Sequence, residues 1–168
     1  ISDFSKHLTE ALEIGRSTLL DESVAEISNV LICGLGGSGI GGTIVTDIVS
    51  DFINVPLCSS KDYSIPNFVD ENTLVIASSY SGNTEETLYA LEACRLRNAQ
   101  IACVTSGGKL AELSKSKGFN CIQIPAGHPP RAMFGYSFTQ LFFILHHYGL
   151  IDDSFQLDFE KGIALLDD

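Results

Sequence analysis

Five short and almost entirely apolar runs recur along this chain, and segments with helical spacing separate most of them. The runs cover residues 29–33, 55–59, 74–78, 101–105 and 120–124. Strands that are buried on both faces show such continuous apolar runs, whereas strands with one solvated face alternate apolar and polar residues. The sequence therefore predicts an α/β fold, in which a five-stranded parallel sheet carries helices on both faces.

The segments between the runs have apolar residues at helical spacing, over residues 2–22, 39–52, 84–98, 108–117 and 137–148. Gly118 and Gly149 stand where a helix is expected to end. Residues 125–131 carry three prolines, so we expect a stiff, non-helical loop there. Residues 137–148 are so apolar that we expect burial against the sheet or a partner, and we consider them a candidate docking surface.

The length and composition favour one principal domain. With 45% hydrophobic and 18% charged residues, the chain has the composition of a soluble globular protein. We assign residues 1–150 to this domain. Residues 151–168 are expected to form a linker, or the start of a helix leading to a further domain, and residues 152–160 have the look of a linker.

The net charge of -11 restricts the kinds of partner. Nucleic acids and anionic membranes are bound largely through lysine and arginine, and this chain has no basic run, so we expect neither as a partner. An anion site in this chain would have to be built locally from backbone N–H groups, hydroxyls and a well-placed cation.

The five cysteines are odd in number and show no C-x-x-C spacing, so we expect reduced thiols and no metal site. No apolar run is long enough to span a membrane, and the first residues lack a signal-peptide pattern. From these features we expect a cytoplasmic location.

A glycine-rich segment, residues 34–42, connects the first strand to the following helix. Glycine lets backbone N–H groups approach an anion, and a helix N-terminus favours negative charge. A tight turn with close strand-helix packing is one alternative. A nicotinamide dinucleotide site is another, because the segment matches G-x-G-x-x-G, but Lys61 rather than an acidic residue follows the second strand.

The third strand also ends in a loop suited to an anion. Residues 78–84 contain four serine or threonine hydroxyls and one glycine. Asn83 followed by Glu86 reads as a capping box, and the alternative is that the hydroxyls only cap a helix. Four hydroxyls exceed that need, so we predict a phosphate site.

Together with the segment 125–136, Pro-Ala-Gly-His-Pro-Pro-Arg-Ala-Met-Phe-Gly-Tyr, these two loops resemble the N-terminal sugar isomerase (SIS) domain of bifunctional phosphoglucose/phosphomannose isomerases. The resemblance covers about residues 29–150. It implies a flavodoxin-like SIS domain and an aldose-ketose isomerase that interconverts glucose 6-phosphate or mannose 6-phosphate with fructose 6-phosphate through a cis-enediol. It implies no metal or organic cofactor.

The resemblance also implies roles for individual residues. Ser79, Ser81 and Thr84 would hold the phosphate, Gly37 and Ser38 would line the sugar side, and Arg131 would stabilise the enediolate as the catalytic residue. A surface salt bridge is the alternative for Arg131. A stand-alone regulatory module that binds sugar phosphate without catalysis is the alternative for the whole chain.

In the resembled family, a glutamate and a histidine of the second SIS half transfer the protons, and no residue of this chain matches their motifs. Glu85, Glu86 and His128 have simpler explanations as residues of a helix start or a loop, and His146 and His147 lie in an apolar helix. We therefore expect these 168 residues alone to be inactive. We also expect a homodimer, or pairing with a second SIS domain.

Overall fold

A single parallel sheet forms the centre of the protein, whose computed structural model describes residues 3–167. The strand order is β2-β1-β3-β4-β5, and every neighbouring pair is parallel. The strands are β1 (Asn29–Gly34), β2 (Leu57–Ser60), β3 (Thr73–Ser78), β4 (Gln100–Thr105) and β5 (Asn120–Gln123). The predicted five-stranded parallel sheet is confirmed, with the order of a flavodoxin-like fold.

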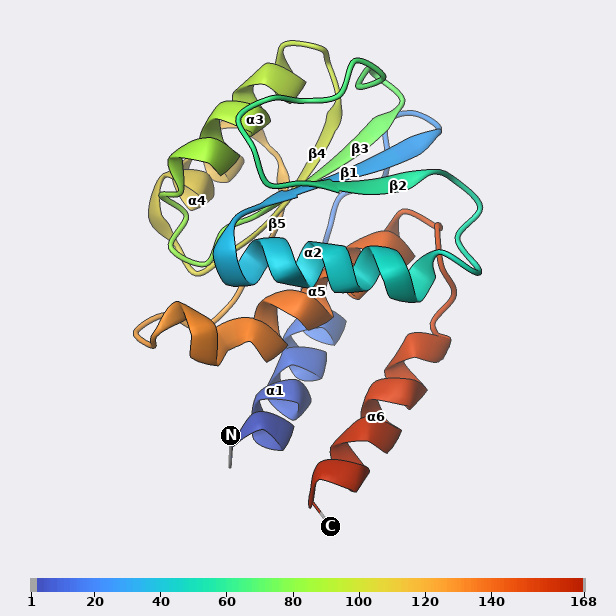
Figure 1. Ribbon diagram of the computed structural model, residues 1–168, viewed down its shortest axis with the longest axis vertical. Coiled ribbons are helices and arrows are strands. Elements are labelled where there is room, and N and C mark those ends of the chain that lie inside the picture. Colours follow the sequence, from blue (N-terminus) through green and yellow to red (C-terminus); the bar gives the residue numbers. More distant parts are fainter. Residues whose placement is uncertain (1–2, 168) are drawn as a thin grey trace.

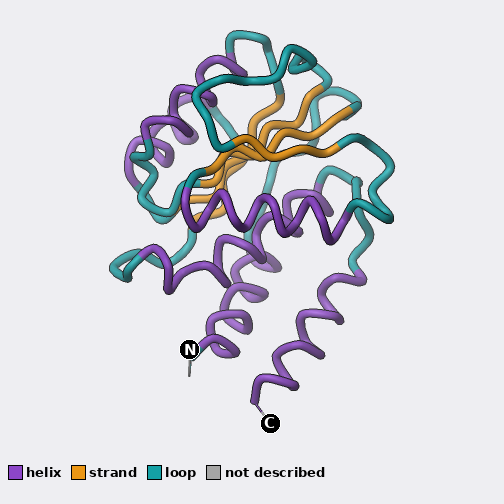
Figure 2. The backbone as a smooth tube through the Cα atoms, viewed as in Figure 1, coloured by secondary structure: helices purple, strands orange, loops and turns teal. Residues whose placement is uncertain are grey.

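Helices cover both faces of this sheet, as predicted (Figures 1 and 2). They are α1 (Phe4–Ser17), α2 (Gly36–Val49), α3 (Glu85–Arg95), α4 (Gly108–Lys117), α5 (Phe134–His147) and α6 (Ser154–Asp167). Ile32 and Ile76 pack with side chains of α1, α2 and α5, whereas Leu31 and Val75 pack with side chains of α3 and α4. Successive strand residues therefore enter opposite cores, which explains why β1 and β3 are apolar throughout.

The apolar helix predicted over residues 137–148 is α5, and it belongs to the core. Leu141, Phe142, Ile144 and Leu145 are at most 3% exposed. One side of α5 packs against the sheet and another against α1, because the N-terminal helix returns to cover it. Burial against the sheet is thus confirmed, and most of this helix is not exposed for docking, although Phe138 remains half-buried.

The proline-rich loop after β5 contains a short helical element that the sequence analysis did not expect. Residues Pro130–Met133 form a single 3-10 turn that leads directly into α5. Proline is compatible with the first position of a helical turn, since the N–H it lacks would have no partner there. Arg131 therefore lies on a helical turn and not in an extended loop, which corrects the expectation for residues 125–131.

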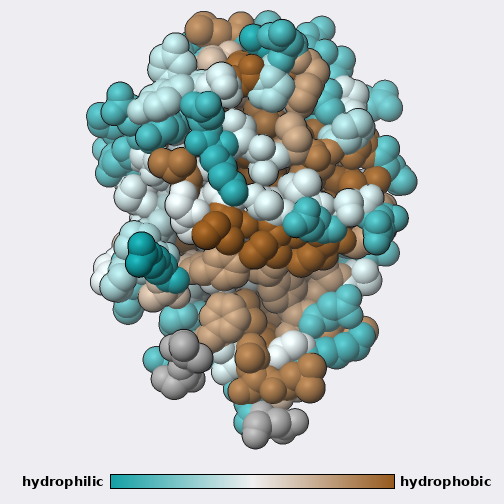
Figure 3. Space-filling model, viewed as in Figure 1, coloured by the Kyte–Doolittle hydropathy of each residue, from teal (hydrophilic) through white to brown (hydrophobic). Residues whose placement is uncertain are grey.

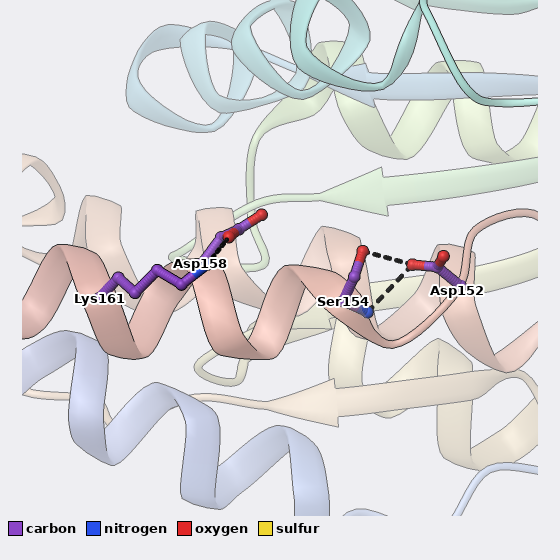
Figure 4. Close-up of polar contacts among 4 residues, drawn as sticks. All are labelled: Asp152, Ser154, Asp158 and Lys161. Carbon is purple, nitrogen blue, oxygen red and sulfur yellow. Dashed lines mark hydrogen bonds and ion pairs between the residues drawn. The ribbon is translucent and has the colours of Figure 1, made fainter.

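Residues 154–167 form the regular helix α6 where we expected a linker or the start of a helix. Asp152 precedes α6, and its carboxylate accepts a hydrogen bond from the backbone N–H of Ser154 at 3.0 Å (Figure 4). The Ser154 hydroxyl and N–H lower the pKa of Asp152. Arg16 of α1 pairs with Glu160 at 2.7 Å, and Phe155 is buried. The ion pair thus holds α6 against α1, and the buried ring of Phe155 packs against phenylalanines of α5.

All five cysteines are free, as expected. Burial raises the pKa of Cys103 to about 12, so this thiol stays protonated at neutral pH. Within residues 3–167, no helix has the length and apolarity needed to cross a bilayer.

Candidate functional site

The two loops singled out in the sequence meet at the carboxyl edge of the sheet. Gly34 at the end of β1 is paired with Ser78 at the end of β3. The chain then continues into α2 on one face and into α3 on the other face. This is the switch point of the strand order, where parallel α/β proteins bind their ligands. The predicted adjacency of the two loops is confirmed.

The glycines between β1 and α2 have separable roles. A Cβ on Gly39 would lie 2.7 Å from the Gly34 carbonyl oxygen, and a Cβ on Gly42 would lie 2.9 Å from the Cγ2 of Ile32. These two glycines therefore permit close packing of α2 on β1, which was the alternative explanation given for the glycine-rich segment. A Cβ on Gly37 would meet nothing within 4 Å. Neither packing nor a positive φ requires glycine there, and the open space suits the approach of a ligand to the backbone.

Helix α2 begins at Gly36, earlier than the predicted residue 39, because Gly36 turns the chain with a φ of 59°. The N-cap residue Leu35 contributes no side-chain hydrogen bond. The first N–H groups of α2 are therefore left without a capping side chain, which is the arrangement that accommodates an anion. Ser38 in this turn is buried, with 9% of its surface exposed.

In the loop after β3, the predicted phosphate residues lie close together. The hydroxyls of Ser79 and Thr84 are 2.8 Å apart, and the Ser81 hydroxyl accepts a hydrogen bond from the N–H of Asn83 at 3.2 Å. Thr84 is the N-cap residue of α3 but makes no side-chain cap. The hydroxyls of Ser79 and Thr84 therefore face each other at the start of α3, Ser81 lies in the same loop, and no side chain caps the first N–H groups of this helix.

The predicted capping box of Asn83 and Glu86 is wrong. The Asn83 amide donates to the Ser81 carbonyl oxygen at 3.1 Å and accepts from the N–H of Lys109 at 3.1 Å. The side chain of Asn83 therefore connects the loop after β3 to the start of α4. The hydrogen bond to Lys109, which is distant in the sequence, therefore replaces the local cap that the spacing of Asn83 and Glu86 predicted.

A third loop that was not predicted from the sequence reaches the site, residues 105–108 between β4 and α4. The Ser106 hydroxyl donates to the Tyr80 carbonyl oxygen at 2.6 Å, and the N–H of Leu110 donates to the Gly82 carbonyl oxygen at 2.9 Å. A Cβ on Gly82 would lie only 1.8 Å from the Gly107 carbonyl oxygen. The run Thr-Ser-Gly-Gly after the fourth strand was the available signal, and it resembles the two loops that were recognised.

The loop after β5 also reaches this edge, since the N–H of His128 donates to the Tyr80 hydroxyl at 3.1 Å. Arg131 is exposed and makes no hydrogen bond or ion pair with any residue in 3–167. The surface salt bridge considered for Arg131 thus has no partner in this part of the chain. The geometry places its loop beside Tyr80 without joining its guanidinium to the phosphate residues.

The remaining acid-base candidates have structural roles. Glu85 and Glu86 lie in the first turn of α3, where carboxylates complement the helix dipole. His146 and His147 lie within hydrogen-bonding distance of the carbonyl oxygens of Ile151 and Asp21, at 3.2 and 2.7 Å. Among the described residues, no three His, Cys, Asp or Glu side chains are grouped as metal ligands would be.

Comparison with known proteins gives concordant results. The family model described as SIS domain matches residues 48–148. A bifunctional phosphoglucose/phosphomannose isomerase of Caldicellulosiruptor bescii is 43% identical over 152 residues, and the match covers 90% of this chain and 45% of the relative. A protein of the same name from Thermoplasma volcanium is 39% identical over 152 residues, with 88% and 48% covered. The chain thus spans about half the length of these relatives.

Among solved structures, the C-terminal domain of glucosamine-fructose-6-phosphate aminotransferase from Francisella tularensis has a similar fold. The TM-score is 0.67 at 16% identity, and the match covers 98% of this chain and 50% of that structure. At this identity the likeness concerns the fold alone. This chain again corresponds to one half of a longer chain.

A comparison of substitutions at Gly82 and Gly118 tests how closely the loops after β3 and β4 touch. Both residues have positive φ, but a Cβ on Gly118 would meet nothing within 4 Å. We expect Gly118→Ala to lower the free energy of unfolding by about 1 kcal/mol, from backbone strain alone. Gly82→Ala should cost about 3 kcal/mol or more, because its methyl group also collides with the Gly107 carbonyl. Urea denaturation of both variants measures the difference. Equal losses would show that the loops do not touch as described.

Proposed function

Because the chain belongs to the SIS domain family, we propose that it forms the phosphate-binding part of an aldose-ketose isomerase. The substrates would be glucose 6-phosphate or mannose 6-phosphate on one side and fructose 6-phosphate on the other. The observation that carries this proposal is the meeting of Ser79, Ser81 and Thr84 with the uncapped starts of α2 and α3 at the switch point. The similarity to phosphoglucose/phosphomannose isomerases supports the choice of substrates.

The phosphate would bind at the start of α3. Hydroxyl groups and backbone N–H groups donate hydrogen bonds to phosphate oxygens, and the start of a helix favours negative charge. The sugar would then extend toward α2, where Gly37 leaves open space and Ser38 lies in the first turn. Holding the phosphate fixes the distance and orientation of the reacting carbons, which is a large part of catalysis.

Arg131 would act on the sugar carbons. The transfer of a proton between C1 and C2 passes through an enediolate, and a guanidinium carries a permanent charge and donates in a planar fork. Arg131 is exposed and without an ion-pair partner among residues 3–167, so its side chain is available to turn toward a substrate. The reaction only moves protons within the substrate, so this proposal needs no cofactor.

Proton transfer requires a base, and none of the described acid-base residues is well placed. We therefore propose that a second SIS domain supplies the base and the ring-opening acid. The relatives are about twice as long as this chain, which leaves room for such a domain in a protein of their kind. The free thiols of the chain support a reducing, cytoplasmic location for the enzyme.

An apolar surface beside α2 suits the docking of that second domain. The exposed face of α2 and the turn after it carry Ile40, Ile44, Ile48 and Phe52, each between 37% and 53% exposed, and a brown band marks apolar residues on this side of the molecule (Figure 3). Next to these residues, a groove of roughly 910 Å³ lies between α2 and α6, lined by Ile48, Phe52, Phe138, Phe159 and Leu166, among others. We name the four side chains and this groove the α2 surface. An apolar area of this kind usually marks an interface.

Phosphate recognition is tested by Ser81→Ala and Thr84→Ala. Each substitution removes one hydroxyl donor, so we expect each to weaken the binding of glucose 6-phosphate by about 1–3 kcal/mol, or about 5- to 150-fold. Thr84→Ser, which keeps the hydroxyl, should bind nearly as the original chain does, and Ser116→Ala on α4 provides a distant control. Calorimetric titration measures these affinities. Equal weakening for glucose 6-phosphate and free glucose would contradict the assignment.

Catalytic incompleteness is tested by assaying fructose 6-phosphate formation from glucose 6-phosphate. The 168-residue chain should bind the substrate without converting it, because the proposal assigns the base to a second domain. Adding the remaining half of the Caldicellulosiruptor bescii relative, which would bring the base, should allow turnover. Robust turnover by the chain alone would contradict the proposal and direct attention to Glu85, Glu86 and His128. If the chain binds the substrate but no turnover occurs, with or without the added half, the result would favour a stand-alone regulatory module that binds sugar phosphate without catalysis.

The docking role of the α2 surface is tested by the oligomeric state. When no other SIS domain is present, we expect a second copy of the chain to cover this surface and form a dimer. Ile48→Asp places a charge within the surface and should leave a monomer, because burying an unpaired carboxylate is costly. Leu96→Asp is the matched control, since Leu96 is 69% exposed at the end of α3 on the opposite face. Light scattering at one protein concentration distinguishes the two states. A monomeric original chain, or equal behaviour of both variants, would rule out the proposed surface.

A further inference from the structure

The loop between β2 and β3 approaches the candidate site from a third side. After Ser60 the chain passes α3 before it returns to β3 (Figure 1). Tyr63 in this loop lies against Tyr89 of α3, with ring centroids 5.8 Å apart. Partial burial and the nearby carboxylates of Glu85 and Glu86 raise the pKa of the Tyr63 phenol. The loop is thus held beside the start of α3.

Lys61 begins the same loop and lies against the start of α2. A Cβ placed on Gly39 would be 3.3 Å from Cγ of Lys61 and 2.7 Å from the Gly34 carbonyl oxygen. The methylene stem of Lys61 therefore runs along the turn between β1 and α2. Two methylene groups and the ammonium extend beyond Cγ, so the charge is carried close to the switch point.

No carboxylate neutralises Lys61 within residues 3–167. Its neighbour Asp62 instead accepts a hydrogen bond from the N–H of Tyr63 at 2.7 Å. The ion pairs of the described chain involve other cations, namely Lys6, Arg16, Arg95 and Lys161. Lys61 is exposed, so its ammonium is accessible to a ligand.

The surroundings of the site favour such a charge. A sugar phosphate carries close to two negative charges at neutral pH, and the chain itself carries a net charge of -11. Glu85 and Glu86 stand in the first turn of α3, next to the hydroxyls that would hold the phosphate. Hydroxyls and N–H groups donate hydrogen bonds but bring no net charge to offset this repulsion.

We propose that Lys61 is the cation that pairs with the phosphate, drawing it to the switch point where α2 and α3 begin, whereas Arg131 would act on the sugar carbons. This inference rests on the proposed function of the same site. Lys61 is a positioning residue in this role, because it binds the phosphate and takes no part in proton transfer. A compact ammonium on a flexible stem suits a ligand that must enter and leave.

The test compares Lys61→Met with Lys115→Met, which removes the same charge near the far end of α4. Titration with glucose 6-phosphate at low salt should show about tenfold weaker binding for Lys61→Met, the usual effect of losing a charged hydrogen bond. Lys115→Met should change the affinity by less than about twofold, since an exposed and distant charge is largely screened. Lys61→Arg should retain most of the affinity, because the charge remains.

Two further measurements separate this role from a structural one. The affinity of the original chain should fall with added salt, and Lys61→Met should show a shallower fall, whereas its thermal unfolding midpoint should stay unchanged because Lys61 is exposed. Equal affinities of Lys61→Met and Lys115→Met would overturn the role of Lys61 and leave the phosphate site intact. Failure of the original chain to bind glucose 6-phosphate would overturn the proposed function, and the role of Lys61 with it.

Discussion

The pairing of β1 with β3 is the constraint on which the site depends. Gly34 and Ser78 are opposite one another at the carboxyl ends of these strands, and the chain leaves them toward opposite faces of the sheet. Two helix starts are thereby brought to one place, although about fifty residues separate them in the sequence. The loop 78–84, the glycine-rich segment 34–42 and the loops after β2, β4 and β5 share one edge of the sheet, and this pairing fixes that edge.

Much of this arrangement could be predicted from the sequence. The strands were recognisable because side chains from both faces, such as Ile32 and Leu31, are buried, so apolar residues run on without interruption. The two loops were recognisable because glycines and hydroxyls gather where a strand gives way to a helix. In each case the pattern is local, and a local pattern can be read without knowing the tertiary structure.

The features that were misjudged depend on contacts between distant residues. The apolar face of α5 was predicted as a docking surface, but α1 covers much of it. Asn83 was predicted to cap α3, but its side chain accepts a hydrogen bond from the N–H of Lys109 instead. The loop after β4 carried a recognisable run of small residues, but only the contact of Gly82 with Gly107 shows that it belongs to the site. Lys61 follows the second strand as a lone cation next to Asp62, and one cation in a loop forms no pattern that indicates a site. The assignments of Ser79, Ser81, Thr84 and Arg131 remain predictions, although three of them share one loop.

The contact between Gly82 and Gly107 has a consequence for ligand affinity. Two backbone segments touch there without side chains between them, and hydrogen bonds of Ser106 and Leu110 hold them on either side. No side-chain rotamer change can loosen a contact between two backbone segments. The loop 78–84 is therefore held in this shape in the absence of a ligand. The conformational entropy of that loop is lost during folding rather than during binding. Each hydrogen bond to an incoming phosphate can then contribute to affinity without first ordering the chain that donates it.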